Sequence, residues 1–279
     1  MQNIIISNPE KFAELKKIFV AQGAQKLHIL TDFDRTLTRA VMNGKSSQSP
    51  VALIRDGNYL TPDYAPKAHA LFDLYHPIEI DSDVTLEEKN KKMHEWWQKH
   101  VDLLIASGLT MGVMREIVSQ GAIRFRENTM EFIDCLHEKN IPLVIMSAGL
   151  GDMIEECLRQ AGRLYENVHV IANLFEFDAK GNAIQVKEPI IHSLNKHETA
   201  IQAFPFFEAV QERRNVLLLG DGLGDLGMVE GFPYDNLMRI GFLNENVEGN
   251  LEKFQKNFDV IICNDGPMDF VLDLCREIV

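Results

Sequence analysis

The feature that most constrains this chain is a short apolar run that recurs along it and ends each time in a small polar cluster. The runs are Leu27–Leu30, Ile141–Met146 and Val216–Leu219, followed by Thr31-Asp32-Phe33-Asp34, Ser147-Ala148-Gly149 and Gly220-Asp221-Gly222. Apolar runs that alternate with helical patterns are typical of a parallel sheet with helices on both faces. We therefore expect an α/β fold in which the polar clusters meet at the carboxyl edge of the sheet, where such folds bind ligands.

Other segments continue the same alternation. Asn8-Pro9 precedes an amphipathic pattern that predicts a capped helix, and a further helix is expected from about Asp152. Two more short strands are expected at Val168–Ile171 and Asp259–Ile262. These elements complete a Rossmann-like core.

Between Arg39 and Arg126 the alternation stops. Residues 41–64 are rich in Gly, Ser, Pro and Asn, which predicts a loop or hairpin. Helical patterns follow at Pro66–Leu74, Leu86–Ile105 and Met111–Gln120. We predict a helical cap domain of residues 39–126, inserted after the first core strand, and a core domain of residues 1–38 and 127–279.

The composition excludes several classes of protein. A net charge of −13 argues against binding a nucleic acid polymer, which needs a basic face. No apolar run approaches the roughly 18 residues that span a membrane, and no secretory signal is visible. We expect a monomer in the cytoplasm whose cysteines, Cys135, Cys157, Cys263 and Cys275, are reduced and mostly buried.

The carboxylates at the strand ends are the first chemical signal. Asp32 and Asp34 would project from the same face of a strand, and adjacent carboxylates repel unless a cation lies between them or one is protonated. Mg²⁺ suits such a site because it prefers oxygen ligands. We expect Asp221 to be a further metal ligand and Asp225 to position its neighbours or orient metal-bound water. Taken alone, each of these residues is equally typical of a solvated turn or a helix cap.

The other clusters suggest an anion site. Ser147-Ala148-Gly149 offers a hydroxyl and backbone N–H groups before a helix, which is a site suited to phosphate. Lys196 supplies a cation that can hold a phosphoryl oxygen, although a lone lysine is most often a solvated surface residue.

In chain order, the set Asp-x-Asp-x-Thr, Ser-Ala-Gly, Lys and Gly-Asp-x-x-x-Asp resembles the haloacid dehalogenase superfamily, whose phosphatases have a Rossmann-like core and a mobile cap. The resemblance implies that Asp32 attacks phosphorus and forms an aspartyl-phosphate, while Asp34 is the general acid and then the general base. It implies Mg²⁺ held by Asp32, the Asp34 carbonyl and Asp221. It also implies a phosphoryl group bound by Ser147, Ala148, Gly149 and Lys196.

The cap carries a narrower resemblance. Tyr75–Asp81 and His94–Lys99, together with Ile191–Lys196 in the core, are similar to the cytosolic 5′-nucleotidase III (pyrimidine 5′-nucleotidase) family. This resemblance implies hydrolysis of nucleoside 5′-monophosphates such as CMP, UMP or 7-methyl-GMP. It places Glu79 at the position that recognises the base, and Trp97 as the residue that stacks on it.

The tryptophans impose a geometric expectation. Trp96 and Trp97 are adjacent on a predicted helix, where successive side chains diverge by about 100°. We therefore expect at most one of them to face the ligand.

The chain departs from the family pattern at a few places. Gly222 stands where a serine is usual, and Arg35 follows the second aspartate where an apolar or small residue is usual. Residues 41–64 match no pattern of the family.

Several alternatives remain open on the sequence. The cap is also compatible with another small phosphate ester, such as phosphoserine or a sugar phosphate. A non-catalytic nucleotide-binding scaffold is disfavoured because Asp32, Asp34, Lys196 and Asp221 are all present, and a metal-free dehalogenase is disfavoured by Asp34 and Asp221. Transfer of the phosphoryl group to a nucleoside acceptor is also compatible with the motifs.

Overall fold

The computed structural model describes residues 3–81, 83–196, 204, 206–231 and 233–279. Its centre is a seven-stranded sheet with the strand order β1-β11-β10-β9-β2-β5-β6, in which only β1 runs antiparallel to its neighbour. The strands are β1 (Ile4–Ile6), β2 (Leu27–Thr31), β5 (Leu143–Leu150), β6 (Val168–Asn173), β9 (Asn215–Gly220), β10 (Asn236–Leu243) and β11 (Val260–Cys263). The predicted α/β fold is confirmed.

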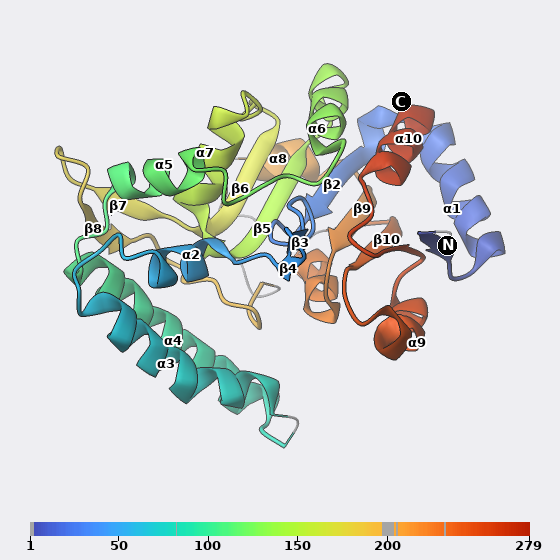
Figure 1. Ribbon diagram of the computed structural model, residues 1–279. Helices are drawn as coiled ribbons and strands as arrows, with labels where there is room; N and C mark the ends of the chain where they lie inside the picture. The colour runs from blue at the N-terminus through green and yellow to red at the C-terminus, as the bar shows by residue number, and fades with distance from the viewer. Residues whose placement is uncertain (1–2, 82, 197–203, 205, 232) are drawn as a thin grey trace.

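Helices cover both faces of this sheet (Figure 1). The helices of the sheet region are α1 (Pro9–Gln22), α6 (Thr129–Glu138), α7 (Gly151–Gln160), α8 (Phe207–Val210), α9 (Val247–Asn257) and α10 (Asp269–Ile278). Successive side chains of a strand point to opposite faces, so Ile29 and Leu30 of β2 join different hydrophobic clusters. Both side chains are fully buried, which fixes the register of this central strand.

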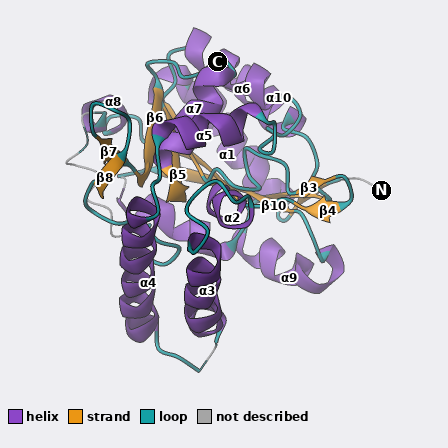
Figure 2. Cartoon of the chain, turned by 60° about the vertical axis from the view of Figure 1, so that its left-hand side comes forward, coloured by secondary structure: helices purple, strands orange, loops and turns teal. Residues whose placement is uncertain are grey.

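The segment between β2 and β5 holds most of the remaining helices. It contains the hairpin β3 (Val41–Met42) and β4 (Lys45–Ser46), followed by α2 (Pro50–Asp56), α3 (Tyr64–Ile80), α4 (Leu86–Ala106) and α5 (Met111–Ser119). Helices α3 and α4 lie side by side and project away from the sheet, whereas α5 lies against α7 (Figures 1 and 2). The division into a core and a cap of residues 39–126 remains a prediction.

The structure corrects some of the expected elements. Residues 41–64 form a hairpin as expected, but they also contain α2, whose start is capped by Ser49 and carries Pro50 in its first turn. Strand β5 continues to Leu150, with a register shift after Met146, instead of ending there. The segment after β9 is a 3₁₀ helix (Leu223–Gly231), because its glycines disfavour a regular α-helix.

Several strands were not predicted from the sequence. Strands β1 and β10 were not expected, nor was the hairpin β7 (Phe175–Phe177) and β8 (Ala183–Val186). The capped helix α1 is confirmed, since the Asn8 side chain accepts a hydrogen bond from the Lys11 amide at 3.0 Å. No described helix is long and apolar enough to cross a membrane.

Arg126 joins the loops that follow β2, β10 and β11. Its guanidinium is buried and lies 4.4 Å from the ring centre of Phe242. It donates hydrogen bonds to the carbonyl oxygens of Arg35, Thr36, Thr38 and Gly266 and to the side chains of Asn244 and Asp265. Burial lowers the pKa of Arg126 to about 10, so it stays charged at neutral pH. One side chain thus ties together loops from distant parts of the sequence.

Replacing Arg126 with methionine should lower the free energy of unfolding by about 3–5 kcal/mol, because the half-buried Asp265 carboxylate loses its charged partner and four carbonyl oxygens lose a donor. Urea denaturation followed by circular dichroism measures the change. The matched control Arg124→Met, at an exposed position, should change stability by no more than about 0.5 kcal/mol. Equal effects of the two substitutions would contradict the role given to Arg126.

His28 gives the fold a dependence on pH. It is fully buried in β2, with Nδ1 2.7 Å from the Arg213 carbonyl oxygen, and burial lowers its pKa to about 4. In the unfolded chain its pKa is about 6.5. The unfolded state therefore binds the proton first as pH falls, and stability is lost between about pH 6.5 and pH 4.

Between pH 7 and pH 5, the wild type should lose about 2 kcal/mol more unfolding free energy than His28→Asn, which cannot titrate. Urea titrations of both proteins at the two pH values measure this difference. Parallel losses in the two proteins would show that His28 is not the titrating group.

Candidate active site

The centre of the site is a buried lysine between two aspartates. Lys196 Nζ donates to Asp32 Oδ1 at 2.7 Å and to Asp225 Oδ1 at 2.9 Å, and all three side chains are about 8% exposed. Burial lowers the pKa of Lys196, but the Asp225 and Asp32 carboxylates outweigh burial and raise it above its ordinary value. The ammonium is therefore a permanent charge beside Asp32.

Asp225 organises the loop after β9. Its Oδ2 accepts hydrogen bonds from the backbone amides of Asp221 at 3.1 Å and Gly222 at 3.0 Å. A Cβ at Gly220 would lie 2.5 Å from the Cβ of Asp225, so only glycine allows this close approach. Both Asp225 oxygens are thus engaged in holding Lys196 and the Asp221 backbone.

Asp32 and Asp34 lie at the end of β2 and differ in their partners. The Asp32 amide donates to the Leu219 carbonyl at 3.0 Å, which joins this residue to β9. Burial raises the pKa of Asp32, with Lys196 opposing and Asp225 adding to that effect. Burial, and after it the charge of Asp32, raises the pKa of Asp34 to about 7. Asp34 therefore exchanges a proton near neutral pH, as a general acid and base requires.

The carboxylates form a cluster that suits a small divalent cation. One oxygen each from Asp32, Asp221 and Asp225 lie within 4.8 Å of one another. Burial, and then the charges of Asp32 and Asp225, raise the pKa of Asp221 well above its ordinary range. The positive charges of the described residues nearby are too few to offset this repulsion between carboxylates. Because Asp225 is already engaged, Asp32 and Asp221 are the carboxylates available to a hard cation such as Mg²⁺.

Arg35 approaches the same cluster. Its backbone φ of 63° lies in the left-handed region, and its Nε lies 3.7 Å from Asp221 Oδ2. Its terminal nitrogen also pairs with Glu245 at 2.9 Å. The side chain therefore spans two carboxylates instead of pointing only to solvent.

The expected anion-binding residues line the same cavity of about 220 Å³ as these carboxylates. Ser147, Ala148, Gly149 and Lys196 surround it together with Asp32, Asp34 and Asp221. The Gly149 amide donates to Ser147 Oγ at 2.9 Å, and a Cβ at Gly149 would lie 3.7 Å from Asp34 Oδ2. The structure thus brings together every core residue that the sequence analysis selected.

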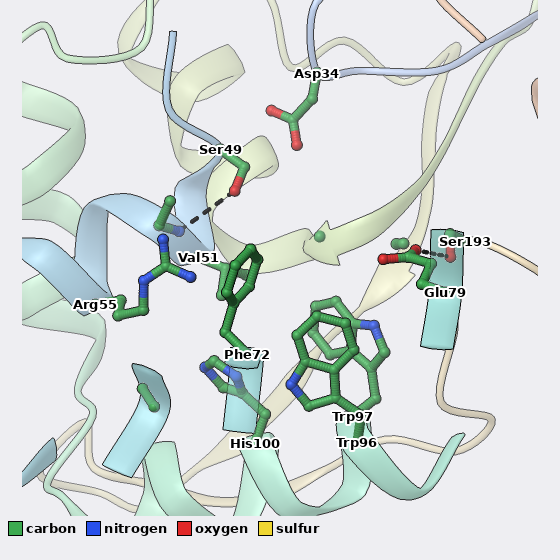
Figure 3. A pocket seen from close by; sticks show the side chains of 14 residues that line it. Asp34, Ser49, Val51, Arg55, Phe72, Glu79, Trp96, Trp97, His100 and Ser193 are labelled. Atoms are coloured by element: carbon green, nitrogen blue, oxygen red, sulfur yellow. Dashed lines mark hydrogen bonds between the residues drawn. The ribbon is translucent and has the colours of Figure 1, made fainter. Parts of the chain in front are cut away.

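A second cavity of about 300 Å³ adjoins the first, and Asp34, Ala148, Gly149 and Ser193 line both. Its far walls come from α2, α3 and α4 (Figure 3). Most of the lining side chains there are large or aromatic: Arg55, Phe72, Glu79, Trp96, Trp97 and His100. Glu79 and Trp97 thus line the same cavity, and their contacts with a base remain a prediction.

Both Trp96 and Trp97 line this cavity, although at most one of them was expected to face a ligand. The Trp96 ring is stacked with Tyr75 of α3 at 5.9 Å, whereas Trp97 lies 6.1 Å from the ring of His100. Each indole is long enough to extend from its own side of α4 to the cavity wall. Divergent Cα–Cβ directions do not prevent two large rings from reaching the same space.

Glu79 links α3 to the loop before Lys196. Its Oε1 accepts a hydrogen bond from Ser193 Oγ at 2.6 Å, and its Oε2 lies 3.2 Å from His76 Nδ1. The carboxylate is thus held in place at the cavity wall.

The second cavity is also lined by Ser193, Arg55 and Phe72, which were not predicted from the sequence. Phe72 and Glu79 are seven positions apart on α3, so helical spacing was a signal that they share a face. Arg55 carried no signal, since its helix was expected to be a loop.

Residues 35–279 match the family model described as pyrimidine 5′-nucleotidase (UMPH-1). The chain is 35% identical over 275 residues to the 7-methylguanosine phosphate-specific 5′-nucleotidase of Gallus gallus, covering 98% of this chain and 95% of that protein. It is 32% identical over 277 residues to the Homo sapiens protein of the same name, covering 99% of this chain and 92% of that one.

Solved structures agree with this assignment. The crystal structure of cytosolic 5′-nucleotidase IIIB bound to cytidine matches with a TM-score of 0.90 and 29% identity, over 100% of this chain and 94% of that chain. A phospho-aspartyl intermediate analogue of phosphoserine phosphatase shares the fold, with a TM-score of 0.52 and 17% identity over 89% of this chain and 97% of that one. This chain therefore belongs to the pyrimidine 5′-nucleotidase (UMPH-1) family, and its fold is that of the haloacid dehalogenase phosphatases.

Proposed function

We propose that this protein is a Mg²⁺-dependent 5′-nucleotidase that hydrolyses nucleoside 5′-monophosphates to nucleoside and phosphate. The observation that carries the proposal is the pair of adjoining cavities with Asp34 in the wall of both. The cavity around Lys196 has charged groups that can bind a phosphate ester, and the cavity around Trp96 and Trp97 has aromatic walls that can stack on a nucleobase. A nucleotide joins these two chemistries in one molecule.

Asp32 is the proposed nucleophile. Lys196 holds its Oδ1, and we propose that Oδ2 is the oxygen that attacks phosphorus. In the first step the Oδ2–P bond forms and the bond from phosphorus to the nucleoside 5′-oxygen breaks. The product on the protein is an aspartyl-phosphate.

Asp34 is the proposed proton carrier. As a carboxylic acid it gives its proton to the departing 5′-oxygen, and as a carboxylate it then takes a proton from the water that attacks the aspartyl-phosphate. The second step breaks the bond between phosphorus and Asp32 and releases phosphate. A pKa of about 7 supports both roles, because neither protonation state dominates at neutral pH.

The remaining core residues stabilise the transferring group. Lys196 supplies positive charge, while Ser147 and the amide of Ala148 supply hydrogen-bond donors for phosphoryl oxygens, and the Gly149 amide joins them by exchanging its present acceptor, Ser147 Oγ, for the phosphoryl group. Asp32, the Asp34 carbonyl and Asp221 are the proposed ligands of Mg²⁺, which when bound neutralises phosphate charge and relieves repulsion between the carboxylates. Asp225 positions Lys196 and the Asp221 backbone.

The cap supplies the base site. Glu79 accepts hydrogen bonds from an exocyclic amino group, and Trp97 stacks on the base, to which we add Trp96 as a second wall. We propose that the cap comprises residues 39–126 and moves relative to the core. The aromatic lining disfavours phosphoserine and sugar phosphates as substrates, and the complete catalytic set disfavours a non-catalytic scaffold. Capture of the aspartyl-phosphate by a nucleoside hydroxyl remains compatible with the site.

The location and the oligomeric state are also proposals. We propose that the protein acts in the cytoplasm, since a Caenorhabditis elegans relative with 32% identity over 275 residues is named a putative cytosolic 5′-nucleotidase 3. We propose that it acts as a monomer, because the residues of both cavities come from a single chain.

Phosphate release from CMP, UMP, 7-methyl-GMP and a set of sugar phosphates, with and without Mg²⁺, tests the proposed function. The wild type should require the metal and prefer nucleotides, and Asp32→Asn should lower the rate by about 10³-fold or more because the nucleophile is lost. The control Asp73→Asn, at an exposed position of α3, should leave the rate unchanged. Preference for sugar phosphates would refute the nucleotide assignment, and full activity of Asp32→Asn would refute the mechanism.

Asp34→Asn separates the two steps. The rate with CMP should fall by about 10²–10⁴-fold because the leaving oxygen receives no proton. With p-nitrophenyl phosphate, whose leaving group needs no proton, the aspartyl-phosphate should form and persist, since no base activates water. Mass spectrometry after rapid acid quenching should find the added phosphoryl group on the peptide that contains Asp32. A phosphoenzyme that turns over as fast as in the wild type would exclude Asp34 as the base.

A further inference from the structure

Arg55 places a positive charge in the wall of the aromatic cavity. It projects from α2, its side chain is 16% exposed, and its guanidinium carbon lies 4.9 Å from the ring centre of Phe72. Burial, and after it the charge of Arg55, lowers the pKa of His100 to about 4, so the imidazole beside it is neutral at neutral pH. Among the described residues that line this cavity, Arg55 is therefore the fixed cation.

The guanidinium is held from outside the cavity. Its Nε donates to Asp56 Oδ1 at 3.0 Å, and Asp56 also accepts from Gln48 and lies 3.3 Å from His69 Nε2. Asp56 is not among the lining residues. No described side chain or carbonyl accepts a hydrogen bond from the terminal nitrogens of Arg55. These nitrogens can therefore donate to a molecule in the cavity.

The opposite wall carries the only carboxylate of the cap that lines the cavity among the described residues, Glu79. In the view of Figure 3, Arg55 and Glu79 lie on opposite sides of the aromatic rings. Ser193 and His76 hold Glu79, as Asp56 holds Arg55. The cavity thus offers hydrogen-bond acceptors at one wall and donors with a positive charge at the other.

This arrangement discriminates between bases by charge. Cytosine and uracil are neutral and present carbonyl oxygens that accept hydrogen bonds from a guanidinium. Guanine is also neutral and offers O6 and N7, the pair of acceptors that arginine commonly binds. In 7-methylguanine the methyl group occupies the N7 lone pair, and the ring carries a positive charge. A mostly shielded guanidinium repels such a ring more strongly than it would in water, and its pairing with Asp56 offsets only part of that charge.

We propose that Arg55 is a specificity-determining residue that selects neutral bases and rejects the cationic 7-methylguanine base. The inference rests on the proposed function for the identity of the ligand. It gives this chain a preference for nucleotides with an uncharged base, in contrast to the substrate named for its 7-methylguanosine phosphate-specific relatives.

Binding of nucleosides tests the inference without any chemistry. The chain contains only two tryptophans, and both line the cavity, so their fluorescence reports its occupancy directly. Titrations with cytidine, uridine, guanosine and 7-methylguanosine give dissociation constants for the wild type, Arg55→Met, Arg55→Gln and Arg55→Lys. Lys67→Met is the matched control, because it removes a charge from an exposed position of α3. Circular dichroism checks that each variant is folded.

The wild type should bind cytidine more tightly than 7-methylguanosine. Arg55→Met and Arg55→Gln should shift the ratio of these dissociation constants by about tenfold in favour of 7-methylguanosine, the effect of removing one fixed charge at close range. Arg55→Lys and Lys67→Met should keep the wild-type ratio. Guanosine controls for the size of the purine ring. It differs from 7-methylguanosine only by one methyl group and the positive charge.

Tighter binding of 7-methylguanosine than cytidine by the wild type would overturn the inference. So would an unchanged ratio in Arg55→Met and Arg55→Gln, or equal rejection of guanosine and 7-methylguanosine. Phosphate release from the corresponding nucleotides reports the proposed function separately. If no nucleotide is hydrolysed, the proposed function fails, while the fluorescence titrations still decide whether Arg55 selects the base.

Discussion

The repulsion between carboxylates at one edge of the sheet is the constraint on which the rest of this structure depends. Asp32, Asp34, Asp221 and Asp225 converge there, and Lys196 is the buried cation that pairs with two of them. Lys196, together with Arg35 beside Asp221, does not balance four carboxylates, so burial and the mutual repulsion of the carboxylates raise the pKa values of Asp32, Asp34 and Asp221. In the proposed function this imbalance has a role, because a site with unmet demand for positive charge suits a divalent cation, and a carboxyl with a raised pKa suits proton transfer at neutral pH.

Holding repelling groups together requires a rigid frame, and the frame comes from loops far apart in sequence. Asp225 ties the Asp221 loop to Lys196, and Arg126 ties the loop after Asp34 to the loops after β10 and β11. Both side chains are buried, and each forms hydrogen bonds with several partners at once. They therefore fix loop positions that the local conformational preferences of the chain would not maintain. Arg126 touches neither cavity, yet the position of the catalytic loop depends on it.

Much of the proposed catalytic set could be predicted from the sequence, because Asp32, Asp34 and Asp221 follow strands, Ser147 lies near the end of one, and parallel strands bring their ends to one edge. Strand pattern alone therefore placed Asp32, Asp34, Ser147 and Asp221 together. The base cavity could not be predicted in this way, since its walls come from helices whose packing no short pattern specifies. Arg55 lies on a helix hidden in a glycine- and proline-rich segment, and the contact of Ser193 with Glu79 joins residues 114 positions apart. Such contacts depend on tertiary packing, which spacing along one element does not reveal.

The two cavities divide the work of the protein between separate parts of the chain. The charged cavity is built at the ends of core strands, and in the proposed function it acts on the phosphoryl group, which is the same in every nucleotide. The aromatic cavity is built mostly from residues between β2 and β5, and its charges at Arg55 and Glu79 lie outside the charged cavity. A substitution in this segment can therefore change the preferred base and leave the groups that transfer phosphate in place. Among the residues that the structure describes, the two cavities share Asp34, Ala148, Gly149 and Ser193, and these four are where the proposed chemistry and substrate choice are coupled.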